Sequence, residues 1–153
     1  MTKTFSNLLT SLFSFLIGVL IAWFTVGYFR QLIRAFYQWT TGNAFQFYGK
    51  PFIFNLDPFY YTIFGMTTLT LWVCLKNLNL KRAAKWTSIS FILFFSLMVI
   101  FALIDGDFRV ISCTMCDEGI VSLHWNDLNY NLITKLSLLL AIIPLIIRTI
   151  KTK

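Results

Sequence analysis

The residues of this chain that could perform chemistry are gathered in the interval 105–131. This interval holds five of the six carboxylates, two of the three cysteines and the only histidine. Cys113 and Cys116 form a CxxC pair, which can close a small local disulfide. Alternatively, the pair can lower the pKa of one thiol, so that its thiolate exchanges with the disulfide of a partner. The interval therefore predicts either a disulfide clip or a catalytic thiol pair.

The same interval also contains a set of zinc ligands. Zinc prefers four ligands in a tetrahedral arrangement, drawn from cysteine, histidine and carboxylate side chains. Cys113 and Cys116 are followed by His124, with seven residues between the second cysteine and the histidine. Asp117 is our candidate for the fourth ligand, with Glu118 and Asp127 as alternatives. One cysteine pair with one histidine is a weaker signal than two complete CxxC knuckles, so zinc binding stays open beside the two thiol interpretations.

The elements that must position these residues are membrane spans. The chain is 58% hydrophobic and only 12% charged, which is typical of a protein whose main solvent is lipid. Its four longest apolar runs are residues 8–29, 59–75, 86–104 and 132–147. We therefore expect an all-α integral membrane protein, a four-transmembrane-helix bundle that forms one domain over residues 1–153. The cations lie at the ends of the apolar runs and form no stripe, which argues against nucleic acid as a partner.

The positive charges predict the orientation of the bundle. With the N-terminus inside, the inner side receives eight cations, from Lys3 to the cluster at Lys153, and the outer side four. Cations favour the cytoplasmic side, so we predict a multi-pass protein of the cell (inner) membrane with both termini cytoplasmic. The intervals 30–58 and 105–131 then become the two extracytoplasmic loops, and the CxxC faces outward.

Four spans with outward cysteines resemble the quinone-reducing disulfide-bond oxidases of bacterial inner membranes and the related vitamin K epoxide reductases. The resemblance implies quinone as a cofactor and Cys113 with Cys116 as a redox pair. It is one of architecture, because those families pass electrons between two cysteine pairs. The first outward loop here, residues 30–58, contains no cysteine. A redox protein of this kind would therefore depend on a partner for its second pair.

The first outward loop is amphipathic and rich in aromatic residues. Arg30, Arg34 and Gln38 recur every four residues, which predicts that the first helix continues and bends onto the membrane surface until Gly42 ends it. Arg30 and Arg34 are our candidates for binding a lipid or quinone headgroup. The aromatic side chains that follow favour the headgroup level, so we expect an interfacial aromatic segment with Phe45, Phe47, Tyr48, Phe52 and Phe54.

The second outward loop contains two short apolar stretches, 108–113 and 120–125. Phe108, Val110 and Ser112 alternate with Arg109, Ile111 and Cys113. This alternation favours a small β-hairpin in the loop.

The spans themselves carry a packing signal. Ser14, Gly18 and Ala22 follow one another at intervals of four residues, a spacing that lets another helix approach closely, within the chain or in a homo-oligomer. Our interpretation is a non-enzymatic accessory or assembly subunit that works through helix packing and presents its outward loop, with membrane lipid and a protein partner or second copy as its contacts. The alternatives are a partner-dependent thiol-disulfide oxidoreductase and an oligomeric pore lined by serine and threonine.

Overall fold

Four long helices and one pair of short strands make up the described part of the molecule. The computed structural model describes residues 3–50, 57–111 and 120–151. Its elements are the helix α1 (Lys3–Thr41), the short 3-10 helix η1 (Gly42–Ala44), the strand β1 (Phe45–Tyr48), the helices α2 (Pro58–Leu75) and α3 (Leu80–Ile111), the strand β2 (Val121–His124) and the helix α4 (Tyr130–Lys151). All four α-helices are long and apolar enough to cross a membrane. They indicate a multi-pass membrane protein with a helix bundle.

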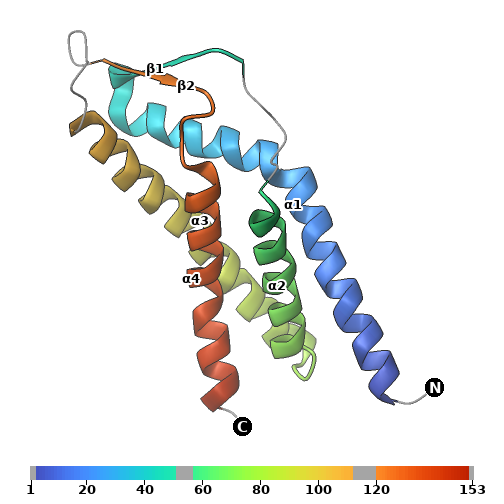
Figure 1. Cartoon of the computed structure of the whole chain (residues 1–153). Coiled ribbons are helices and arrows are strands. Elements are labelled where there is room, and N and C mark those ends of the chain that lie inside the picture. Colours follow the sequence, from blue (N-terminus) through green and yellow to red (C-terminus); the bar gives the residue numbers. More distant parts are fainter. Residues whose placement is uncertain (1–2, 51–56, 112–119, 152–153) are drawn as a thin grey trace.

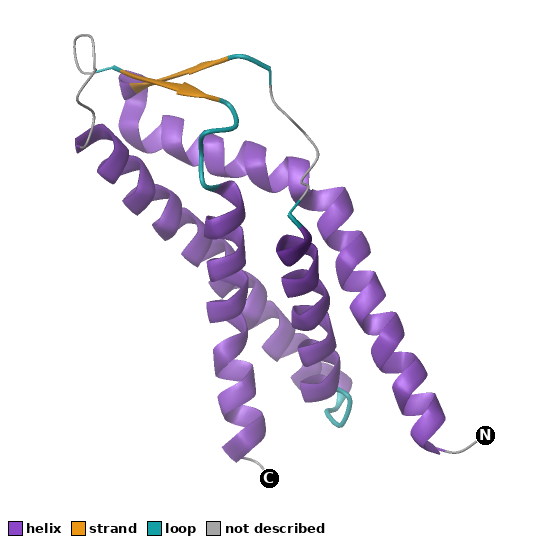
Figure 2. Cartoon of the chain, in the orientation of Figure 1, coloured by secondary structure: helices purple, strands orange, loops and turns teal. Residues whose placement is uncertain are grey.

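The two ends of the bundle differ in what they carry. Both chain termini lie at one end, together with the turn between α2 and α3, as an even number of crossings requires (Figure 1). The two strands lie at the opposite end, above the start of α4 (Figure 2). We call this second end, built from the C-terminal halves of α1 and α3, the strand pair and the first turns of α4, the cap.

The first helix is much longer than one membrane crossing. Its 39 residues span about 58 Å at 1.5 Å per residue, against a hydrocarbon core of about 30 Å. The helix accommodates this length by bending, and its second half runs across the end of the bundle (Figure 1). It ends at Gly42, whose φ of 57° lies in the left-handed region that glycine adopts most readily.

The predicted β-hairpin in the second loop is wrong. Phe108 and its neighbours up to Ile111 belong to α3, because Asp105 and Arg109 pair across one helical turn and continue the helix. The strand β2 pairs instead with β1 of the first loop, in parallel, with Phe45 opposite Val121 and Tyr48 opposite His124. The two loops are therefore joined to each other by main-chain hydrogen bonds.

The aromatic segment is folded onto the protein where it is described. Phe45 is 4% exposed and its ring packs edge-on against Tyr37 of α1. Phe47 contacts the ring of Trp125, just after β2. These two rings form part of the cap, whereas Tyr48 is 55% exposed. Their position at a membrane interface stays a prediction. Phe52 and Phe54 lie outside the described residues.

The helices pack closely at one polar contact between α1 and α2. The Ser14 hydroxyl donates to the Thr68 carbonyl at 3.0 Å, and the Thr68 hydroxyl donates to the Ser14 carbonyl at 2.8 Å. One turn further along α1, Gly18 lies against the backbone of Phe64 and Gly65, and Ala22 is fully buried. The small side chains thus face the second helix of the same chain.

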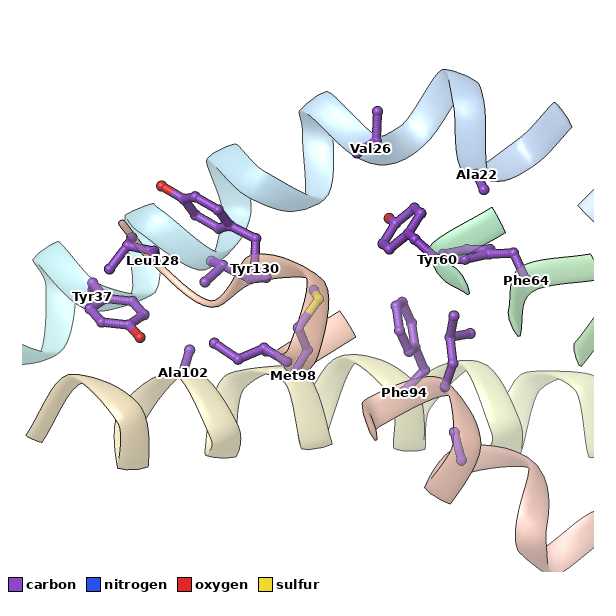
Figure 3. Packing of buried hydrophobic residues seen from close by; sticks show 14 of the residues in the cluster. Ala22, Val26, Tyr37, Tyr60, Phe64, Phe94, Met98, Ala102, Leu128 and Tyr130 are labelled. Carbon is purple, nitrogen blue, oxygen red and sulfur yellow. The ribbon is translucent and has the colours of Figure 1, made fainter. Parts of the chain in front are cut away.

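The core is aromatic and runs from the bundle into the cap. Buried side chains of the helices point toward one another, with Tyr60 and Phe64 of α2 facing Phe94 and Met98 of α3 (Figure 3). The ring of Phe29 lies between them, 6.0 Å from Phe64 and 5.4 Å from Phe94. In a membrane, where lipid tails are as apolar as leucine, interlocking contacts of this kind hold helices together by packing.

Candidate functional site

The cap is held together by a chain of polar contacts from α1 to α4. The hydroxyl of Tyr37, a fully buried residue, donates to the carboxylate of Asp105 on α3. Arg109 donates to the same carboxylate at 3.1 Å and to the carbonyl of Asp127 at 3.1 Å. These bonds connect α1, α3 and the segment before α4. Asp105 therefore accepts hydrogen bonds from two side chains of the protein.

His124 is built into the same segment by its backbone and its ring. Its N–H donates to the Asp127 carboxylate at 3.0 Å, and its Nδ1 accepts from the N–H of Asn126 at 3.2 Å. The ring stands edge-on to Tyr48 and closes over Gly49, whose φ is 83°. A side chain at position 49 would collide with this ring. One ring nitrogen of the predicted zinc ligand is thus already engaged by the backbone.

The remaining predicted thiol and zinc ligands cannot be placed beside it. Cys113, Cys116 and Asp117 lie outside the described residues, so the disulfide, redox and zinc interpretations stay predictions. Within residues 3–50, 57–111 and 120–151, no group of three histidine, cysteine or acidic side chains gathers at one point.

The two arginines predicted to contact a headgroup pack against aromatic rings of the cap. The guanidinium of Arg34 lies 3.7 Å from the ring centroid of Trp125, and that of Arg30 lies 5.6 Å from the ring centroid of Tyr130. Cation–π contacts of this kind orient a guanidinium while its N–H groups still donate to other partners. Tyr130 is itself fixed, because its hydroxyl donates to the Trp125 carbonyl at 2.8 Å.

A polar cavity opens beside the start of α4, and Arg30 is one of its walls. Its volume is about 310 Å³. It is lined by Arg30, Asn126, Leu128, Asn129, Tyr130, Asn131, Leu132 and Lys135. Among these described lining residues there are two cations and three asparagines but no carboxylate. Tyr130, Asn131 and Leu132 belong to the first turn of α4, so the cavity lies beside the positive end of the helix dipole. The structure therefore brings Arg30 together with Lys135, whereas Arg34 is held on Trp125.

Lys135 is oriented by a carboxylate at the start of α2. Its ammonium lies 2.8 Å from Oδ2 of Asp57. The other oxygen of Asp57 accepts from the N–H of Phe59 at 3.0 Å and so caps α2, with Pro58 in the first turn. Lys135 therefore ties α4 to the beginning of α2.

This ion pair makes a pH-dependent contribution to stability. The hydrogen bond from Lys135 holds the pKa of the Asp57 carboxyl below its ordinary value. The contribution is therefore fully present above about pH 4, the unfolded-state value, and is lost as the pH falls through the folded-state pKa. In an Asp57→Asn variant, which keeps a good capping residue, we expect a loss of about 1 kcal/mol at pH 7. Thermal unfolding from pH 7 to pH 3 should show the two proteins converging in acid.

The Lys135→Gln variant is the matched control for that experiment. It removes the same pair from the other side, so most of the dependence on pH should disappear in it, leaving the part that comes from the backbone hydrogen bonds to Asp57. A difference between wild type and Asp57→Asn that persists unchanged at pH 3 would contradict the ion-pair explanation.

The sequence also predicted a pore lined by serine and threonine. The structure shows what the hydroxyls of three of these threonines bind. Thr62, Thr67 and Thr70 each donate to the carbonyl four residues earlier in α2, at 2.7 to 2.9 Å. Their hydroxyl protons are thus used within their own helix. Pore formation stays a prediction.

Residues in the wall of the polar cavity and beside it were missed by sequence reasoning. Neither Lys135, inside the predicted span 132–147, nor its partner Asp57 was predicted as a site residue, although an acidic residue before proline is a typical helix start. The ion pair between Lys135 and Asp57 joins positions 78 residues apart, and no local sequence pattern indicates it. Asn126, Asn129 and Asn131 were likewise not predicted as site residues.

Comparison with known proteins adds no further constraint on this site. No family model, no curated protein and no solved structure matches the chain.

Proposed function

We propose that this chain is a non-enzymatic membrane subunit that binds an anionic lipid headgroup in the polar cavity beside α4. The observation that carries the proposal is the lining of that cavity, which combines Arg30 and Lys135 with the amide end of α4. Asp57 offsets part of the charge of Lys135, and Arg30 adds a second cation to the wall. An anion with several oxygens, such as a phosphate, suits this set of donors.

The position of the cavity favours a lipid over a soluble anion. Arg30 directly follows Phe29, which packs in the apolar core against Phe64 and Phe94. Likewise, Lys135 lies one turn before Leu138, which is buried between the helices. The cations therefore stand where the apolar part of the bundle gives way to the polar cap. A headgroup occupies this depth in a bilayer.

The wider role that we propose is that of an accessory or assembly subunit in the cell (inner) membrane. With the termini cytoplasmic, as the loop charges favour, the cavity and the cap face outward. Two features support a binding role for the rest of the molecule. The bonds among Tyr37, Asp105 and Arg109 stiffen the cap, and the first helix carries large exposed apolar side chains, including Phe24 at 72% and Tyr28 at 73%. Lipid, a protein partner or a second copy would cover this surface.

The test compares the lipids that remain bound to the purified chain. Native mass spectrometry from bilayer discs with equal amounts of phosphatidylglycerol and phosphatidylcholine should show preferential retention of phosphatidylglycerol. We expect Arg30→Gln to weaken that retention about tenfold, because a hydrogen bond to a charged group contributes about 1.5–3 kcal/mol. Arg82→Gln removes an exposed cation from the first turn of α3, at the opposite end of the bundle, and should change nothing.

Two results would overturn the proposal. One is equal retention of phosphatidylglycerol by wild type and Arg30→Gln. The other is displacement of the lipid by millimolar inorganic phosphate, which would make the site one for a soluble anion.

A further inference from the structure

A second cavity lies inside the bundle, on the apolar side of the first. Its volume is about 150 Å³. All four helices contribute to its wall, through Ile21 and Phe29 of α1, Phe64, Thr67, Thr68 and Leu71 of α2, Thr87, Ser90, Phe91 and Phe94 of α3, and Leu138, Ala141 and Ile142 of α4. Phe64 and Phe94 point into the same space between the helices (Figure 3).

The wall of this inner cavity is mainly apolar. The hydroxyls of Thr67 and Thr87 donate to the carbonyls four residues earlier, at 2.7 and 2.9 Å. Thr68 donates across to Ser14. With these three protons engaged, Ser90 is the remaining hydroxyl in a mainly apolar wall, and cavities lined by apolar groups at about this volume stay dry and accept hydrocarbon. An α-helix, about 10 Å across, is too wide for it.

The two cavities follow each other along the same two helices. On α1, Phe29 lines the inner cavity and Arg30 lines the polar one. On α4, Lys135 lines the polar cavity and Leu138, one turn later, lines the inner one. From Lys135 to Ile142 the helix rises about 10 Å. A molecule with an anionic head and a hydrocarbon chain matches this succession of walls.

We propose that the inner cavity holds a segment of one acyl chain of the lipid whose headgroup occupies the polar cavity. This inference rests on the proposed function. It adds that the inner cavity recognises the acyl chain of the lipid by its shape. A bilayer is as apolar as the cavity, so transfer of the chain gains little from the hydrophobic effect. The gain comes from filling a void whose lining otherwise lacks contact partners. The headgroup supplies affinity, and the cavity selects a chain that can bend between the helices.

The experiment uses phosphatidylglycerol with a photoreactive diazirine in the middle of one acyl chain, incorporated into bilayer discs with the full chain. After illumination, mass spectrometry of the peptides should locate adducts on lining residues such as Phe64, Phe94 and Ile142. Ala141→Phe fills the cavity, since Ala141 is 3% exposed and lines it. We expect these adducts to fall at least fivefold in this variant. Leu139→Phe, on the exposed side of the same helix turn, should leave them unchanged.

A second cavity-filling variant keeps the test valid if Ala141→Phe does not fold. Ser90→Leu reaches the same cavity from α3 and should reduce the same adducts. Adducts confined to exposed positions such as Leu139, with the preference for phosphatidylglycerol intact, would overturn the tail site and leave the headgroup site standing. Equal labelling of the cavity by a phosphatidylcholine with the same chain would overturn the headgroup function.

Discussion

Replacing Gly18 with alanine is expected to destabilise the protein by about 3 kcal/mol and to push α1 away from α2. A Cβ atom at this position would lie 2.6 Å from the Phe64 carbonyl oxygen and 2.9 Å from the Cα of Gly65, and still closer to the Thr68 hydroxyl. The first two are backbone atoms of the facing helix and cannot rotate aside. The paired hydrogen bonds between Ser14 and Thr68, one turn away, would lengthen with the helices. Thermal unfolding in mild detergent measures the loss.

Two variants make that measurement specific. Gly106→Ala places its Cβ 3.2 Å from the ring of Tyr37, a side chain that can shift slightly, so we expect a smaller loss of about 1 kcal/mol. Ile17→Ala changes an exposed neighbour of Gly18 and should stay within about 0.5 kcal/mol of wild type. If all three variants unfold together with wild type, the close approach of α1 and α2 is not a determinant of stability.

Much of the bundle could be predicted because the hydropathy of a membrane helix is a property of its own local sequence. The apolar runs 8–29, 59–75, 86–104 and 132–147 each lie within one of the four helices. The helices are longer than these runs. The continuation of the first helix to Gly42 was predicted and is confirmed, whereas the extension of α3 to Ile111 was not predicted. The helices continue past the apolar runs into the cap, where polar side chains such as Asp105 and Arg109 find partners within the protein. Hydropathy alone places the end of a membrane span at the first polar residues.

The cap was less predictable because its contacts join distant parts of the chain. The alternation around Phe108 also fits a helix in which Asp105 and Arg109 meet one turn apart. The strand β2 has its partner in β1, more than 70 residues earlier, and the pairing is parallel. The spacing of Arg30 and Arg34 correctly placed them on one helix. It could not show that this face is covered by Trp125 and Tyr130 and not by water.

The largest polar effect is expected from Asp105→Ala, which should destabilise the cap by about 2–3 kcal/mol. The change removes the acceptor of two donors at once, the Tyr37 hydroxyl and the Arg109 guanidinium. Tyr37 is fully buried, so its hydroxyl would be left without an acceptor and without water. The side chains of Arg109 and Asp105 are 24% and 28% exposed, which lets solvent replace part of their attraction. The hydroxyl of Tyr37 therefore accounts for most of the expected loss.

A second variant tests whether the Tyr37 hydroxyl accounts for most of the loss expected in Asp105→Ala. Tyr37→Phe removes the donor together with its need for an acceptor, so it should cost only about 1 kcal/mol, less than Asp105→Ala. In the double variant the orphaned hydroxyl no longer exists, so the combined loss should be smaller than the sum of the two single losses. Asp107→Asn, exposed on the same helix, serves as the control and should leave unfolding unchanged. Additive losses in the double variant would show that Tyr37 and Asp105 act independently, and the cap would then owe its rigidity to the strand pair and the aromatic contacts.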